Sequence, residues 1–306
     1  MNETNEAREA DDEPIFLFAG FSEILISIGL IALMVALGLF NAYIMIAGAL
    51  VASYFFVLKR RLTLPGIVLV LAIYVGCTLL FYFTQFESID SFEDFQFFGV
   101  VLKSIVLSAI LVAYYFFFRL PFALYPLAWS LFSVLGGLIM YYLIGDDIRL
   151  TESMNFSYST IAFLSGLAAF IVAIWFDKKD LLRKTSDNQK AFWLHLFAAP
   201  MMLWPWVFRF MIEQTTSNAI IAAIGIFAMA LIGLIIDRRS FVTIGILSFV
   251  TILSYFVDGF GKNVQMILFV VGGYALIMGA FWRGLRKAIF KLIPARFVGS
   301  FIPPLQ

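Results

Sequence analysis

Long apolar runs recur along almost the whole chain, separated by short polar segments. A helix needs about 17–25 mainly apolar residues to cross a bilayer, because lipid offers no partner for backbone polar groups. The first two candidates belong to one apolar stretch that is too long for a single crossing, and we divide it at Gly38 and Asn41. The pattern then predicts ten membrane-spanning helices, near residues 22–40, 42–58, 64–83, 97–118, 122–143, 155–176, 191–212, 219–236, 241–257 and 264–282.

The predicted fold class is an all-α, polytopic membrane protein with one transmembrane domain, residues 22–282. An acidic tail, residues 1–21, precedes it, and a basic tail, residues 283–306, follows it. Ten helices also divide into two sets of five, and an odd number per set would invert one half relative to the other, as in inverted-repeat transporters. Limited sequence support for this 5+5 hypothesis comes from glycine pairs in the fifth and tenth segments. Two segment ends, Asp177-Lys-Lys and Asp237-Arg-Arg, are also similar, although the positive-inside rule would produce that too.

Composition excludes a soluble domain. Of the 306 residues, 62% are apolar and 13% are charged, against roughly 45–50% and 25% in soluble domains. A water-soluble fold could not bury that much apolar surface, and we expect no nucleic-acid partner. The single cysteine, Cys77, excludes an intramolecular disulfide and a cysteine metal site.

The distribution of basic residues predicts the orientation, because Lys and Arg collect in short cytoplasmic loops. With both termini in the cytoplasm, most of the 21 bases fall on that side. They are Arg8, Lys59, Arg60, Arg61, Arg119, Lys178, Lys179, Arg183, Lys184, Lys190, Arg238, Arg239, Arg283, Arg286, Lys287, Lys291 and Arg296. The loops on the other side are acidic. We interpret these acids as solvated loop ends. The alternative is a divalent-cation site, although the acids do not have the spacing of an EF-hand loop.

The basic tail has helical amphipathicity, with Leu285, Ile289, Leu292 and Ile293 on one face and bases on the rest. This pattern predicts a helix lying in the cytoplasmic membrane interface, with anionic lipid headgroups as its partner. The alternative is a solvated tail.

Ionisable residues within a span are costly, and each one therefore raises a functional hypothesis. Lys103 is a candidate cavity-lining or ligand-binding residue in the fourth span. The alternative is that its stem snorkels to the surface, because it lies about two turns from one end of that span. Glu23 and Asp258 lie at the edges of their spans, where headgroup water reaches them. We interpret these two acids as structural.

The seventh span holds the only histidine, His195, together with Pro200, Pro205 and Arg209. At 100° per residue in a straight helix, His195, Met202, Trp206 and Arg209 form one stripe. One interpretation is a bent helix that lines a cavity or binds a ligand, with His195 able to titrate and Arg209 placed to meet an anion. In the simpler interpretation, Arg209 lies at the membrane interface and His195 forms a hydrogen bond with a neighbouring helix. No carboxylate lies within one turn of His195 to pair with it.

The sequence contains no phosphate-binding loop, serine-nucleophile elbow, His-Glu-x-x-His motif or acidic pair within a span. We therefore predict a protein that is not an enzyme and has no metal or cofactor.

The run Asp187-Asn-Gln-Lys-Ala-Phe-Trp-Leu-His-Leu-Phe-Ala-Ala-Pro, then Ile236-Asp-Arg-Arg and a basic tail ending Ile302-Pro-Pro-Leu, resembles a family of uncharacterised bacterial multi-pass membrane proteins. The resemblance covers residues 160–306 and implies a bacterial cytoplasmic (inner) membrane protein without implying an activity. A second histidine often stands in that family where this chain has Trp204, which weakens a two-histidine site. A looser resemblance, in span count and termini only, is to drug/metabolite-type transporters.

Together these features favour a transporter or permease-like protein with a small-molecule substrate and with the seventh span beside the pathway. The alternative is a non-transporting membrane scaffold or assembly partner, for which the 18% aromatic content and a basic cytoplasmic face would suffice.

Overall fold

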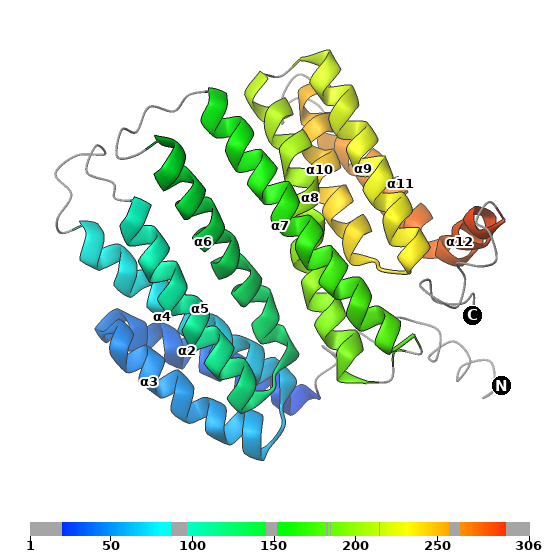
Figure 1. Cartoon of the computed structure of the whole chain (residues 1–306). Helices are drawn as coiled ribbons and strands as arrows, with labels where there is room; N and C mark the ends of the chain where they lie inside the picture. Colours follow the sequence, from blue (N-terminus) through cyan, green and yellow to red (C-terminus); the bar gives the residue numbers. More distant parts are fainter. Residues whose placement is uncertain are drawn as a thin grey trace, which may run out of the picture. The chain divides into compact units, whose positions relative to one another are not determined.

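The computed structural model of the chain describes residues 20–86, 97–144, 152–181, 183, 185–213, 215–256 and 264–291. The acidic N-terminal tail, the acidic loops 87–96 and 145–151, Asp258 and the tail beyond 291 lie outside these residues. The described residues form helices joined by turns, without a strand among them (Figure 1). The helices fall into two compact units, a first built from residues 14–155 and a second built mainly from residues 156–306.

The helices follow the predicted segments closely. The first unit contains α2 (Phe21–Phe40), α3 (Ala42–Ser53), the π-helix η1 (Tyr54–Lys59), α4 (Thr63–Phe86), α5 (Phe97–Phe118), the 3-10 turn η3 (Pro121–Ala123) and α6 (Leu124–Ile144). The second contains most of α7 (Glu152–Lys179), then α8 (Ser186–Glu213), α9 (Thr216–Ile236), α10 (Ser240–Phe256), α11 (Val264–Ala280) and α12 (Trp282–Phe290). Each of the ten predicted spans coincides with a helix, which confirms the all-helical fold class for the described residues.

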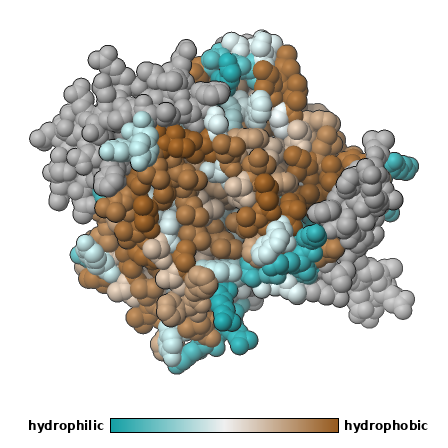
Figure 2. Space-filling view, in the orientation of Figure 1, coloured by the Kyte–Doolittle hydropathy of each residue, from teal (hydrophilic) through white to brown (hydrophobic). Residues whose placement is uncertain are grey.

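Eight helices, namely α2, α3 with η1, and α4 to α9, are long and apolar enough to cross a membrane by themselves. Hydrophobic side chains cover much of the surface visible in Figure 2, as in helices that face lipid. The chain is therefore a multi-pass membrane protein. The described part of α10 has 17 residues, and the end of α11 bends by 68° into α12, so the total of ten crossings stays a prediction.

The long apolar stretch is divided at Asn41, as predicted, whereas Gly38 lies within α2. Asn41 has an extended backbone, and its side-chain Oδ1 accepts a hydrogen bond of 2.7 Å from the N–H of Tyr43, which caps the start of α3. A Cβ on Gly38 would lie only 2.9 Å from the sulfur of Met45, so the absence of a side chain there lets α3 fold back beside α2.

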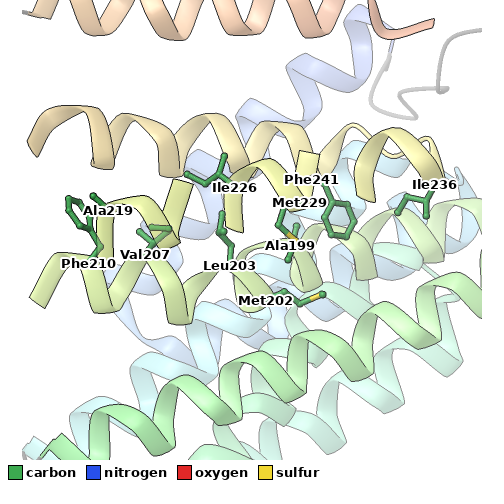
Figure 3. Packing of buried hydrophobic residues seen from close by; sticks show 11 residues of the cluster. Ala199, Met202, Leu203, Val207, Phe210, Ala219, Ile226, Met229, Ile236 and Phe241 are labelled. Carbon is green, nitrogen blue, oxygen red and sulfur yellow. The ribbon is translucent and has the colours of Figure 1, made fainter. Parts of the chain in front are cut away.

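An apolar cluster between α8, α9 and α10 forms the centre of the second unit (Figure 3). Leu203 and Phe210 of α8 pack there with Ile226 of α9 and Phe241 of α10, and each of these side chains is at most 5% exposed. Phe163 and Phe170 of α7 pack against the same cluster. Four consecutive helices of this unit thus share one core.

The tail helix α12 differs in part from the prediction. Leu285 and Ile289 are half-buried against a cluster that includes Val242 and Trp282, so the protein itself covers part of this apolar face. Arg286 is buried, whereas an interfacial helix would turn its bases outward. Leu292 and Ile293 lie outside the described residues.

Gly166 lies at a close approach between α7 and α8. A Cβ at this position would lie 2.7 Å from Cβ of Met201 and 2.9 Å from the backbone nitrogen of Met202. We therefore expect Gly166→Ala to lower the unfolding temperature of the protein in detergent, at a cost of about 1–3 kcal/mol, as for other overpacked sites.

Gly272→Ala in α11 is the matched control for Gly166→Ala, because a Cβ on Gly272 would meet no atom within 4 Å. Thermal unfolding of both variants in the same detergent separates crowding from the general gain in helix propensity on replacing glycine. Equal stabilities of the two variants would contradict the close contact of α7 with α8.

Candidate functional site

Four polar side chains are buried together where α7 ends, α8 begins and α9 turns into α10. They are Asp177 at the end of α7, Asn188 and His195 on α8, and Arg238 in the α9–α10 turn. His195 and Arg238 are fully buried, and Asp177 is 6% exposed. Ionisable groups this well buried are rare unless they are paired.

The carboxylate of Asp177 is the centre of this group, which we call the Asp177 network. Arg238 donates from Nη2 to Oδ1 of Asp177 and from Nε to Oδ2, the second bond being 3.4 Å long. The same Nη2 donates to Oδ1 of Asn188 at 2.7 Å. Nε2 of His195 lies 2.8 Å from Oδ2 of Asp177. One buried ion pair therefore links α7, α8 and the turn before α10.

Two aromatic rings enclose the imidazole of His195. The rings of Phe170 on α7 and Phe241 on α10 stand edge-on to it, with centroid separations of 5.5 and 5.6 Å. These apolar neighbours keep water from the ring and strengthen its electrostatic interaction with Asp177.

A second cluster, the Asp237 network, lies in the same part of the second unit. Asp237 accepts a hydrogen bond of 2.8 Å from Nε1 of Trp282, and its Oδ2 lies 3.5 Å from Arg183 and 3.3 Å from Arg286. Arg183 also donates to the backbone carbonyl of Asp237 at 2.6 Å, and Arg286 donates to that of Leu234 at 3.1 Å. The α12 helix is thereby tied to the α9–α10 turn.

The two networks connect the same two segments of the chain. The α7–α8 segment supplies the acid Asp177 and the base Arg183, whereas the α9–α10 turn supplies the acid Asp237 and the base Arg238. Each acid pairs with the base of the other segment. This reciprocal arrangement holds the two segments together at two points.

Local backbone geometry brings Asp237 and Arg238 into place. Asp237 ends α9 in the left-handed conformation, with φ of 59°, and the N–H of Arg238 bonds back to the carbonyl of Gly233 at 2.8 Å. A Cβ on Gly233 would lie 3.0 Å from the carbonyl oxygen of Arg238, so glycine allows the turn to fold onto the helix. An αL cap usually carries Gly or Asn. The donors around its carboxylate offset the cost of placing Asp there.

This chemistry suits charge pairing and proton exchange, since Asp177 and His195 share a hydrogen bond. It does not suit a metal ion. Among the described residues, no three His, Cys, Asp or Glu side chains come close enough to bind one.

The residues of the stripe predicted on α8 differ in their burial. His195 and Met202 are buried, whereas Trp206 is 41% exposed and the side chain of Arg209 is 67% exposed beside Glu213, 3.8 Å away. The structure brings His195 into a buried polar group, and a common cavity or ligand site for the four residues stays a prediction. The helix also continues through Pro200 and Pro205 as a single element.

Lys103 makes a contact between two helices of the first unit. Its Nζ donates a 3.0 Å hydrogen bond to the carbonyl of Phe81 on α4. The ammonium thus connects α5 to α4, and both its reach to the membrane surface and a role in a ligand site stay predictions.

Sequence reasoning missed Asp177 as the partner of His195. No carboxylate lies within one turn of His195 along the chain, but α7 brings one from 18 positions away. The similar segment ends, Asp177-Lys-Lys and Asp237-Arg-Arg, were the available signal, because both acids prove to be centres of the two networks.

No family model, curated protein or solved structure matches this chain. The resemblance of residues 160–306 to uncharacterised bacterial membrane proteins therefore stays a prediction. Any functional conclusion must come from the geometry of the two networks.

Asp177→Asn is expected to lower the free energy of unfolding by about 3–5 kcal/mol, because it leaves Arg238 buried without a counter-charge. Titration of the purified protein with a denaturing detergent measures this loss. The double variant Asp177→Asn/Arg238→Met should lose less stability than the two single losses combined, since it removes both charges together.

Asp187→Asn is the control for this experiment. Asp187 lies at the start of α8 and pairs with Lys190, 2.7 Å away, with both side chains partly exposed. The loss there should stay below about 1 kcal/mol. A loss as large as that of Asp177→Asn would contradict a special role for the buried network.

Proposed function

We propose that this protein is a small-molecule transporter or permease of the bacterial cytoplasmic membrane, and that the Asp177 and Asp237 networks form its cytoplasmic gate. The observation that carries the proposal is the reciprocal pairing of Asp177 with Arg238 and of Asp237 with Arg183. The paired segments connect four helices of one core, so separating them would open one end of that core.

Burial of the charges favours a gate over a permanent structural link. A buried ion pair contributes little net stability compared with apolar residues of similar volume, because desolvation offsets the attraction. When the segments separate at a membrane surface, however, water hydrates the charged groups of the pair. Paired charges can therefore support a closed and an open state of similar free energy, as a transport cycle requires.

The remaining polar atoms also suit a network with two arrangements. Nδ2 of Asn188 is buried and donates no hydrogen bond within the described part of the chain. A partly satisfied network is less firmly fixed than a complete one. His195 belongs to the same network, since its Nε2 lies 2.8 Å from Oδ2 of Asp177.

The positive-inside rule supports the proposed side of the membrane. Both gate segments are rich in bases, including Lys178, Lys179 and Arg239, so we place them in the cytoplasm with both termini. This orientation includes crossings by α10 and α11, giving ten in total.

Single cysteines in a Cys77→Ala protein test this topology with a membrane-impermeant maleimide. Ser186→Cys in the α7–α8 segment is expected to react only in inside-out vesicles. Thr216→Cys at the start of α9 and Gln265→Cys at the start of α11 should react only in right-side-out vesicles. All three native side chains are exposed. Reaction of Gln265→Cys on the same side as Ser186→Cys would show that α10 does not cross.

The gate itself is tested at Ala199, which is 1% exposed in the core between α8 and α9. In the Cys77→Ala protein, Ala199→Cys should react slowly with the impermeant maleimide. Adding Asp177→Asn is expected to raise the rate about tenfold or more in inside-out vesicles, since a loss of about 1.4 kcal/mol in gate closure increases the open population tenfold. The rate in right-side-out vesicles should not change.

Asp187→Asn provides the control, because Asp187 lies in the same segment but outside both networks. Faster reaction from both sides would indicate general loosening and contradict a gate. An unchanged rate from both sides, with normal folding, would favour the alternative of a non-transporting scaffold whose ion pairs only hold the helices together.

A further inference from the structure

Four non-glycine residues in the described part of the chain have a left-handed backbone, and each follows the end of a helix. Three of them are Arg61, Arg119 and Arg183, with φ of 54°, 51° and 55°, and the fourth is Asp237. This conformation costs a side-chain-bearing residue about 1–2 kcal/mol, which is why glycine usually occupies it. A charged residue retained at such a position suggests that its side chain has a use.

In the second unit that use is visible, because Arg183 pairs with Asp237. In the first unit the two left-handed residues are both arginines. Arg61 follows η1 and Arg119 follows α5, and both line one hollow of about 610 Å³. Two arginines thus line the same hollow in the first unit, whereas in the second unit the left-handed residues Arg183 and Asp237 form an ion pair.

The described helices of the first unit offer these arginines little counter-charge. The sequence contains no Asp or Glu from residue 24 to 86 or from residue 97 to 144. Both arginines are exposed, and neither side chain has an ion-pair partner within the described part of the chain. Lys59 and Arg60 directly precede Arg61 and add to the positive potential.

The wall of the hollow also suits an anion. Thr63 lines it and is the first residue of the 24-residue helix α4, so the positive end of that helix lies beside the hollow. Phe116 and Phe117 line it as well and are 71% and 74% exposed, which supplies an apolar rim.

We infer that this hollow is a binding site for a phosphate-type anion, held between Arg61 and Arg119. A guanidinium donates two parallel hydrogen bonds to a phosphate, and two guanidiniums match a phosphomonoester or phosphodiester better than they match a neutral ligand. The ligand is either the headgroup of an anionic lipid, whose chains would lie along the phenylalanine rim, or a soluble phosphate compound. The site is independent of whether the protein transports.

The test uses Arg61→Gly/Arg119→Gly, which removes both side chains and relieves the left-handed backbone. This variant should be at least as thermally stable as the parent, so lost binding cannot be attributed to misfolding. Lys59→Gln/Arg60→Gln is the matched control. It removes two charges from the same turn, at residues that do not line the hollow.

Two probes identify the source of the phosphate. Native mass spectrometry counts phosphatidylglycerol molecules retained from mixed phosphatidylcholine and phosphatidylglycerol micelles. Thermal unfolding in inorganic phosphate, against chloride at equal ionic strength, detects a soluble anion. We expect the glycine variant to bind at least one of these probes about tenfold or more weakly than the control variant, the loss of about 1.4 kcal/mol in binding.

Selective loss of phosphatidylglycerol would assign the site to a lipid headgroup, and selective loss of stabilisation by phosphate would assign it to a soluble ligand. Equal behaviour of the glycine variant and the control with both probes would overturn the proposal. It would reduce the arginines to members of a general basic surface.

Discussion

The need to neutralise buried charge governs the second unit. Arg238 is completely enclosed, and Asp177 and Asn188 accept hydrogen bonds from its guanidinium there. Those acceptors belong to different helices, so a single guanidinium fixes how α7, α8 and the start of α10 meet. Apolar contacts elsewhere in the unit are less selective, because lipid chains offer similar contacts to the same side chains. Polar pairing therefore sets the register that the apolar core then fills.

The first unit achieves helix contact by different means. Hydroxyl pairs join its helices, with Tyr114 donating to Ser53 at 3.0 Å and Ser108 lying 2.9 Å from Ser130. Small neutral groups of this kind cost less to bury than ions. The first unit can therefore pack its helices without carboxylates, and its arginines stand at the surface.

Much of the fold follows from local sequence, whereas the site does not. Each helix could be placed because spanning length is a property of one segment, and Asn41 marks a break by its own capping chemistry. The pairing of Asp177 with Arg238 joins residues 61 positions apart, so it depends on which turns meet and has no local spacing. Burial along the stripe that included Arg209 could not be predicted for a related reason: a helical wheel assumes the same neighbours along the whole helix, whereas His195 is buried and Arg209 is exposed.

The bend between α11 and α12 has a consequence for the order of assembly. Two residues beyond that bend contact Asp237: Trp282 donates a hydrogen bond to it, and Arg286 forms an ion pair with it. The ribosome makes Asp237 about 45 residues before Trp282, so α9 must enter the bilayer while its terminal carboxylate lacks these partners. A chain that stops before α12 would keep every long apolar helix and still present that carboxylate without them. Among the described helices, α12 thus completes the pairing of Asp237 only after the long apolar helices have been made.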